Sequence, residues 1–373
     1  MRSRSLRKEA EKKLPARRET RRIPAGVITR LAAVLTAVLL AAGLSACDQS
    51  GPATIAPPQG EAPAKNIYAM VSKDIHNPYM KKAYDGFEAA CREIGAEPLF
   101  QGPDIATPER QIEIIDHLVA QDVSLITVTA NDADALYPAL HGAMEKGIKV
   151  ISFDSAVNKD SRLTHVQQAN PEQIGRVLVQ AAYEIAGGEG GIAVLSTTRQ
   201  ATNQNLWIEW MKKELGENPE KYSKTPLIRI AYGDDEPVKS ANAARELLQD
   251  PEIKVIIAPT AVGILAAGKY IKDNNSQVLL TGLGLPSDMA EYIEGGVCPW
   301  MYLWNPVDLG YLTAYTGDAL VNGLITGEVG GTFFAGNMGE RVITEAADGG
   351  TEVMLSDLFK FDKANIAVWK EVY

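Results

Sequence analysis

The sequence places side chains with several hydrogen-bonding atoms, together with aromatic rings, in a few short segments. The polar members are Lys73, Asn77, Asp154, Asn203, Gln204 and Asn205, and the aromatic members are Tyr79, Trp207 and Trp304. Carboxylates and amides can each pair with two adjacent hydroxyl groups, and flat rings can cover the C–H faces of a sugar ring. This mixture predicts a binding site for a polyhydroxylated small molecule.

Each of these residues also has an ordinary structural explanation, and the sequence leaves both open. Lys73 and Asp154 are either solvated loop charges or a buried pair that faces across a cleft with the ligand between them. The run Asn203-Gln204-Asn205 also suits a helix cap, because asparagine is favoured there. Trp207 lies on a predicted helix, where tryptophan is more often core, whereas Trp304 follows a strand and is harder to explain as core.

The elements that must position these side chains alternate regularly from residue 66 onward. Predicted strands lie at 67–71, 97–100, 125–129, 149–153, 191–195, 227–231, 255–258 and 278–282. Predicted helices lie at 80–94, 108–120, 136–146, 171–186, 205–215, 238–248 and 261–272. This alternation indicates parallel sheets with helices on both faces, and two runs of similar length indicate two lobes. Ligands bind at the carboxyl ends of such strands, and most of the polar and aromatic residues follow a strand end.

The beginning of the chain predicts export. Residues 31–42 are uncharged and follow an arginine-rich start, but this run is shorter than the roughly 20 apolar residues that span a bilayer. A basic start, a short apolar core and small residues make a secretory signal. Here it ends in Leu44-Ser45-Ala46-Cys47, which resembles the bacterial lipobox. The alternative is an ordinary cleaved signal in which the cysteine is incidental.

The lipobox resemblance implies that residues 1–46 are a lipoprotein signal peptide and that Cys47 is acylated. Two or more acyl chains hold a protein stably on a membrane, here from the periplasm or the outer face of the cytoplasmic membrane. Residues 47–65 are rich in Pro, Gly and Ala and predict a flexible tether between the lipid and the fold.

Charge and cysteine content exclude several classes of protein. Residues 1–46 hold 11 of the 37 basic and 3 of the 47 acidic residues, so the mature chain carries a net charge of −18. Such a surface repels phosphate backbones, so we expect no nucleic-acid partner. Cys91 and Cys298 are predicted to be two partly buried thiols rather than a disulfide. The histidines and cysteines have no metal-ligand spacing, and we expect neither a metal nor a cofactor.

Several strings resemble one family over residues 66–373, in order and at matching spacing. These strings are Phe153-Asp154-Ser155, the run 201–207 (Ala-Thr-Asn-Gln-Asn-Leu-Trp), the run 256–260 (Ile-Ile-Ala-Pro-Thr), the run 281–286 (Thr-Gly-Leu-Gly-Leu-Pro) and Leu303-Trp304-Asn305-Pro306. They resemble the rhamnose-binding proteins of bacterial ABC importers. The autoinducer-2 receptors of the same superfamily are similar, with a ligand pattern that corresponds here to Lys73, Asp154, Asn203-Gln204, Pro259 and Ala261. Asn203 departs from that pattern, which has aspartate. The segment 73–79 looks more like ribose-type binders, which carry a stacking aromatic there.

The resemblance implies an α/β fold of periplasmic binding protein type I, with two doubly wound parallel-sheet lobes joined by a multi-strand hinge. The first lobe would comprise 66–166 plus 306–336, and the second 167–305 plus 337–373, with crossings near 166–169, 301–306 and 336–341. The implied ligand residues are Lys73, Asn77, Tyr79, Asp154, Asn203, Gln204, Trp207, Pro259, Thr260, Ala261, Leu283, Trp304 and Asn305. The first lobe would supply Lys73 and Asp154, and the second the residues from Asn203 to Ala261.

The implied function is a monomeric binder that delivers a monosaccharide, L-rhamnose or a related deoxyhexose, to an ABC permease. Autoinducer-2 and a ribose-type pentose or hexose stay open as alternative ligands. We do not expect an enzyme, because the sequence has no Gly-x-Ser-x-Gly elbow and no phosphate loop. Asp154 with Asp132 or Asp134 would be the one glycosidase-like pair. A chemoreceptor accessory role is compatible with the same sequence.

Overall fold

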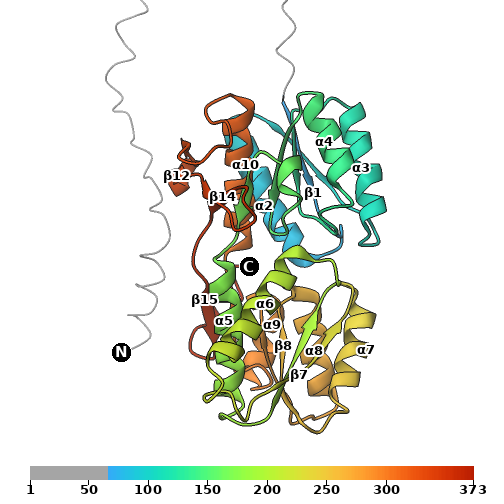
Figure 1. Ribbon diagram of the computed structural model, residues 1–373, viewed down its shortest axis with the longest axis vertical. Coiled ribbons are helices and arrows are strands. Elements are labelled where there is room, and N and C mark those ends of the chain that lie inside the picture. Colours follow the sequence, from blue (N-terminus) through green and yellow to red (C-terminus); the bar gives the residue numbers. More distant parts are fainter. Residues whose placement is uncertain (1–65) are drawn as a thin grey trace, which may run out of the picture. The chain divides into compact units, whose positions relative to one another are not determined.

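The computed structural model describes residues 66–373, which form two α/β lobes (Figure 1). The predicted signal peptide, the predicted tether up to residue 65 and the predicted acylation site Cys47 lie outside the described residues. The first lobe holds a seven-stranded sheet of order β13-β14-β5-β4-β3-β1-β2. Its strands are β1 (Ile67–Val71), β2 (Glu97–Gln101), β3 (Leu125–Val128), β4 (Lys149–Phe153), β5 (His165–Gln167), β13 (Thr344–Glu345) and β14 (Thr351–Met354). All neighbours pair in parallel except β13 with β14.

Helices cover both faces of this sheet because its strands are apolar on both faces. In β1, Tyr68 and Met70 pack into the core beneath α2 (Pro78–Ile94) and α10 (Pro306–Val321). The alternate residues Ala69 and Val71 pack into a separate core beneath α3 (Pro108–Ala120) and α4 (Tyr137–Glu145).

The second lobe repeats this design around a four-stranded parallel sheet of order β7-β6-β8-β9. Its strands are β6 (Gly191–Ser196), β7 (Leu227–Tyr232), β8 (Ile253–Ala258) and β9 (Leu279–Gly282). Its helices are α5 (Pro171–Ile185), α6 (Thr202–Glu217), α7 (Pro237–Leu247), α8 (Ala261–Asp273) and α9 (Pro286–Glu294). An antiparallel pair, β10 (Trp300–Leu303) and β15 (Phe359–Asp362), lies beside β9 and is followed by α11 (Ile366–Trp369). The hairpin β11 (Thr332–Phe334) and β12 (Glu340–Val342) and the short helices η1 (Lys159–Ser161) and η2 (Gly336–Met338) complete the described elements.

The predicted fold class is confirmed, and so are most element positions. Strand 149–153 and helix 108–120 match their predicted bounds, whereas α6 begins at Thr202, three residues earlier than predicted. Cys91 and Cys298 are both buried thiols.

The chain crosses between the lobes three times, and one predicted crossing was wrong. It leaves the first sheet after β5 and enters α5 at Pro171, and it returns between β10 and α10. We expected the third crossing near 336–341 and all of 337–373 in the second lobe. Instead β14 extends the first sheet beside β5, so the third crossing lies at 355–358, between β14 and β15. The pairing of β14 with β5 sets this boundary, because a strand belongs to the sheet whose backbone groups it satisfies.

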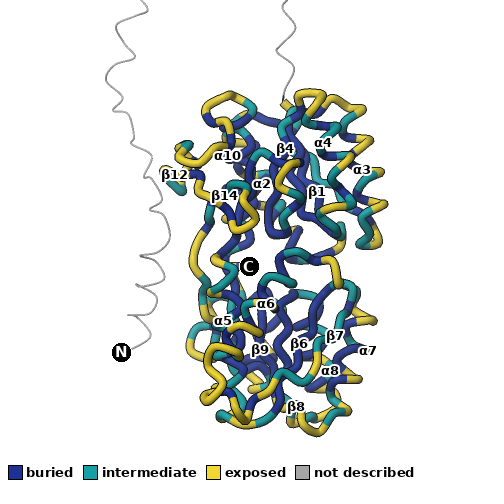
Figure 2. Tube along the Cα trace, in the orientation of Figure 1, coloured by how far each residue is buried: buried dark blue, intermediate teal, exposed yellow. Residues whose placement is uncertain are grey.

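Figure 2 shows that buried residues run through both lobes and toward the region between them. In the first lobe, α2 and α10 pack very closely because each presents a glycine. A Cβ atom added at Gly310 would lie 1.6 Å from the carbonyl oxygen of Ala83, and one at Gly86 would lie 1.8 Å from that of Val307. These are backbone atoms, which cannot move aside as a flexible side chain can.

We predict that Gly310→Ala destabilises the protein by at least about 2 kcal/mol, since overpacking in a core typically costs about 1–3 kcal/mol. Helix propensity alone would favour alanine over glycine by about 1 kcal/mol. Gly142→Ala is the matched control, because Gly142 is also helical and its added Cβ would meet nothing within 4 Å. Urea unfolding should show a loss for the first variant and no loss for the control. Equal stability of both variants would contradict the packing argument.

Candidate ligand-binding site

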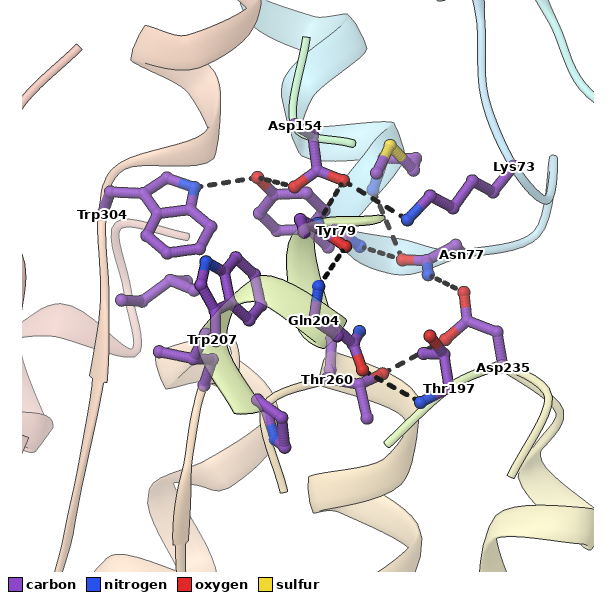
Figure 3. A pocket seen from close by; sticks show the side chains of 16 residues that line it. Lys73, Asn77, Tyr79, Asp154, Thr197, Gln204, Trp207, Asp235, Thr260 and Trp304 are labelled. Atoms are coloured by element: carbon purple, nitrogen blue, oxygen red, sulfur yellow. Dashed lines mark hydrogen bonds and ion pairs between the residues drawn. The ribbon is translucent and has the colours of Figure 1, made fainter. Parts of the chain in front are cut away.

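Both lobes line a cavity of about 50 Å³ (Figure 3). Its lining residues are Lys73, Asn77, Tyr79, Met80, Asp154, Thr197, Asn203, Gln204, Trp207, Asp235, Pro259, Thr260, Ala261, Leu283, Leu303 and Trp304. Residues from the ends of β1 and β4 face residues from the ends of β6, β7, β8 and β9, as expected for parallel sheets.

The structure brings together all the predicted ligand residues except Asn305. Asn305 is the N-cap of α10, where its side-chain oxygen accepts a hydrogen bond from the Val307 amide at 3.0 Å, and it does not line the cavity. Its neighbour Trp304 does. Asn205 also lies outside the lining, and its side chain donates to the carbonyl of Arg199.

Among the cavity residues that the first lobe supplies, Asp154 has the most hydrogen-bond and ion-pair partners. Its Oδ2 accepts from the Thr129 hydroxyl at 3.1 Å and lies 3.8 Å from Lys73 Nζ, while Tyr79 donates to Oδ1 at 3.4 Å. Burial raises the pKa of Asp154, and the charge of Lys73 opposes that rise. The sequence left open whether Lys73 and Asp154 are solvated loop charges or a buried pair with the ligand between them. They follow β1 and β4 of the first lobe, which are separated in the sheet by β3. The two side chains are more than nine-tenths buried and pair directly with each other.

A second buried carboxylate, Asp235, was missed by the sequence analysis. Its Oδ2 accepts from Asn77 Nδ2 at 2.9 Å, and its Oδ1 accepts from the Thr260 hydroxyl at 3.2 Å. Burial raises the pKa of Asp235, again opposed by the charge of Lys73. Asp235 lies three residues after β7, so the rule that strand ends hold the ligand would have found it had it been applied to that strand.

The side-chain amide of Asn77 has two roles, one for its oxygen atom and one for its nitrogen atom. Its oxygen caps α2 by accepting from the amide of Tyr79 at 2.9 Å, and Pro78 at the first position supports the start of that helix. Its nitrogen is therefore the atom that reaches Asp235 in the opposite lobe.

Other hydrogen bonds also join the lobes directly. Asn203 Nδ2 donates to Asp154 Oδ2 at 3.3 Å, and the hydroxyls of Ser155 and Thr202 lie 2.9 Å apart. The structure thus presents the lobes in contact around the cavity.

The aromatic residues form one wall. Trp304 Nε1 donates to the Tyr79 hydroxyl at 2.8 Å, and the two rings meet edge to face with centroids 6.2 Å apart. Trp207 lies 6.0 Å from Trp304 between ring centroids and is 2% exposed, so it is both a core residue and part of the lining.

Two polar atoms of the lining make no hydrogen bond within residues 66–373: the Thr197 hydroxyl and Trp207 Nε1, both buried. Gln204 is held by Oε1, which accepts from the Ser196 hydroxyl at 2.7 Å and from the Thr197 amide at 2.9 Å. Its amide nitrogen remains a donor. Buried polar groups normally have partners, so these atoms are the ones with hydrogen-bonding capacity left for a polar ligand.

The glycosidase-like pair considered from the sequence does not form. Asp132 Oδ1 accepts from the backbone amides of Asp134 and Ala135 and stabilises a turn, and neither Asp132 nor Asp134 lines the cavity. Within residues 66–373, no group of three or more His, Cys, Asp or Glu side chains is arranged to hold a metal ion. No helix in the same part of the chain is long and apolar enough to cross a membrane.

Residues 68–325 match the periplasmic binding protein domain. The chain belongs to the periplasmic binding protein family. An ABC transporter solute-binding protein from Clostridium phytofermentas with bound L-rhamnose is 46% identical, with a TM-score of 0.80 over 83% of this chain and 99% of that one. A sugar ABC transporter protein from Actinomyces odontolyticus is 37% identical, with a TM-score of 0.64 over 81% of this chain and 96% of that one.

More distant relatives share the fold. LsrB from Clostridium saccharobutylicum, in complex with AI-2, is 20% identical with a TM-score of 0.75 over 81% of this chain and 98% of that one. The ribose import binding protein of Escherichia coli is 20% identical over 303 residues, which is 79% of this chain and 93% of that protein. The family is one of non-enzymatic solute-binding proteins, and this chain is one of its members.

We predict that Lys73→Met destabilises the protein by about 3 kcal/mol at pH 8, because removing one partner of a buried ion pair leaves uncompensated charge. The deficit should shrink as the pH falls. The pKa values of Asp154 and Asp235 are higher in the folded protein than in the unfolded chain. Their buried negative charge therefore lowers the free energy of unfolding by its full amount above the folded pKa, and this loss disappears as the two carboxylates become protonated at lower pH.

Lys239→Met is the control, since Lys239 is half exposed and pairs with Asp234 at the surface, where ion pairs are worth about 0–1 kcal/mol. Chemical denaturation of both variants at pH 5 and pH 8 tests the prediction. A deficit for Lys73→Met that is equal at the two pH values would contradict it.

Proposed function

We propose that this protein captures a monosaccharide outside the cytoplasm, L-rhamnose or a related deoxyhexose, and delivers it to an ABC import permease. The observation that carries the proposal is the cavity itself: both lobes line it, and it holds buried polar atoms for which the described chain provides no partner. The L-rhamnose bound to the 46% identical protein supports this choice of sugar.

The proposed mechanism is hinge closure. A ligand shifts the balance toward the closed form only if it binds that form better, and a ligand that contacts both lobes at once does so. Asp154 and Lys73 on one side, with Gln204 and Thr197 on the other, supply donors and acceptors for ring hydroxyls. Trp304 and Trp207 supply an apolar surface suited to the methyl group of a deoxyhexose.

A calorimetric screen of L-rhamnose, other deoxyhexoses, ribose, galactose and autoinducer-2 tests the choice of ligand. L-Rhamnose or a related deoxyhexose should bind most tightly. Tightest binding of autoinducer-2 or of ribose would replace the deoxyhexose with one of the two alternatives. Turnover of any sugar during the titration would contradict a role in binding alone.

We predict that Asp154→Asn weakens sugar binding by tenfold or more, since a hydrogen bond to a charged group contributes about 1.5–3 kcal/mol. Asparagine suits this position because Asp154 has a φ of 57°, a conformation that asparagine tolerates. Asp122→Asn is the control, because Asp122 is exposed, lies beyond the end of α3 and has a φ of 53°. Unchanged calorimetric affinity of the Asp154 variant would remove this carboxylate from the site.

We also propose that the protein is a monomer held to the membrane through lipid on Cys47, with residues 47–65 as tether. The support is the sequence Leu44-Ser45-Ala46-Cys47 after an uncharged apolar run. Wild-type protein expressed in a bacterial host should fractionate with membranes and incorporate labelled palmitate. Cys47→Ala should lose the label, and a variant that keeps it would contradict the assignment.

A further inference from the structure

The cavity has an unbalanced set of charges. Among its lining residues only Lys73, Asp154 and Asp235 carry formal charge at neutral pH. Lys73 pairs with Asp154 at 3.8 Å, while the hydrogen bonds of Asp235 come from the neutral side chains of Asn77 and Thr260. Two carboxylates therefore share one cation, and all three side chains are buried.

Three helices begin at this cavity, which would ordinarily favour an anion. The first residues or caps of α2, α6 and α8 all contribute to the lining, and helix N-termini carry a partial positive charge. Asp235 already occupies this environment. It accepts from Asn77, the N-cap of α2, and from Thr260, the N-cap of α8. Asp235 thus places a negative charge beside the N-terminal ends of α2 and α8.

We propose that Asp235 is a specificity-determining residue that restricts this site to sugars without negative charge, so that sugar acids and sugar phosphates are rejected. The inference rests on the proposed function. A ligand anion about 5 Å from a buried carboxylate, at an effective dielectric constant of about 20, should lose about 100-fold in affinity relative to a neutral sugar of the same shape. Neutral hydroxyls donate to the remaining lone pairs of the same carboxylate.

Asp235→Asn removes the charge and keeps the hydrogen bonds. Asn77 must present its nitrogen, because its oxygen caps α2, so the new carbonyl oxygen can accept from it. The new amide can donate to the Thr260 hydroxyl. Asp235 has a φ of 57°, which asparagine also adopts, so the backbone need not change.

Asp234→Asn is a closely matched control. Asp234 is the preceding residue and has a φ of 51°, but its side chain is about half exposed and pairs with Lys239 at 3.1 Å, outside the cavity. The Asp234→Asn substitution removes one negative charge from the same loop, as Asp235→Asn does.

Calorimetric titrations at pH 7.5 should compare neutral sugars with charged partners of matched shape. One set is L-rhamnose, L-mannose and L-mannuronate, which share one ring and differ in a methyl, hydroxymethyl or carboxylate group. The other is ribose with ribose 5-phosphate. Wild type and Asp234→Asn should bind each charged sugar about 100-fold more weakly than its neutral partner. Asp235→Asn should narrow that ratio at least tenfold, although the loss of a charged acceptor also weakens its binding of the neutral sugar.

Equal affinity of wild type for a neutral sugar and its charged partner would overturn the proposal, as would an unchanged ratio in Asp235→Asn. Neutral binding with no charge discrimination leaves the proposed function intact and removes only this inference. Absence of binding by every sugar in both sets defeats the proposed function, and the inference with it.

Discussion

The structure depends on keeping the Asp154 carboxylate buried where the two lobes meet. A carboxylate taken out of water is costly unless hydrogen bonds and an opposite charge replace the lost hydration. Thr129, Tyr79 and Lys73 provide these from the first lobe, and Asn203 provides another from the second. The carboxylate is therefore fully coordinated only when the lobes are together. This requirement couples the chemistry of the site to the position of the lobes.

The connection between the lobes also contributes to the aromatic wall of the cavity. Trp304 lies between β10 and α10, where the chain returns to the first lobe, and its indole donates to Tyr79 on α2. The close glycine contact holds α2 and α10 together, and Tyr79 lies on α2 while Trp304 precedes the first residue of α10 by two positions. Trp207 contacts this pair from α6, in the second lobe. Trp207 therefore supplies the second lobe's part of the aromatic wall.

Much of the site was predictable because parallel strands end at one edge, and the sequence shows where strands end. Lys73, Asp154 and Gln204 were found in this way, and Thr260 was found through the family resemblance. Pairings between distant segments were not predictable by the same means. The predicted lobe boundary failed at β14, since nothing in that short segment reveals that it pairs with β5. Asp235 was missed although it follows a predicted strand, and its partnership with Asn77, 158 residues away, becomes visible only in the fold.

Glycosidases also hold two carboxyl groups in one cavity. The surroundings of Asp154 and Asp235 are therefore more informative about function than the presence of the pair. Glycoside hydrolysis needs one protonated acid and one ionised group placed on either side of a bond, with room for water or for attack. Here burial raises the pKa of both Asp154 and Asp235, and Lys73 opposes the rise in both. The same two influences thus act in the same direction on both carboxylates. Both carboxylates instead accept hydrogen bonds from rigidly held donors, which suits holding hydroxyl groups in place. The arrangement of donors and acceptors thus accounts for a family that binds and releases its ligand unchanged.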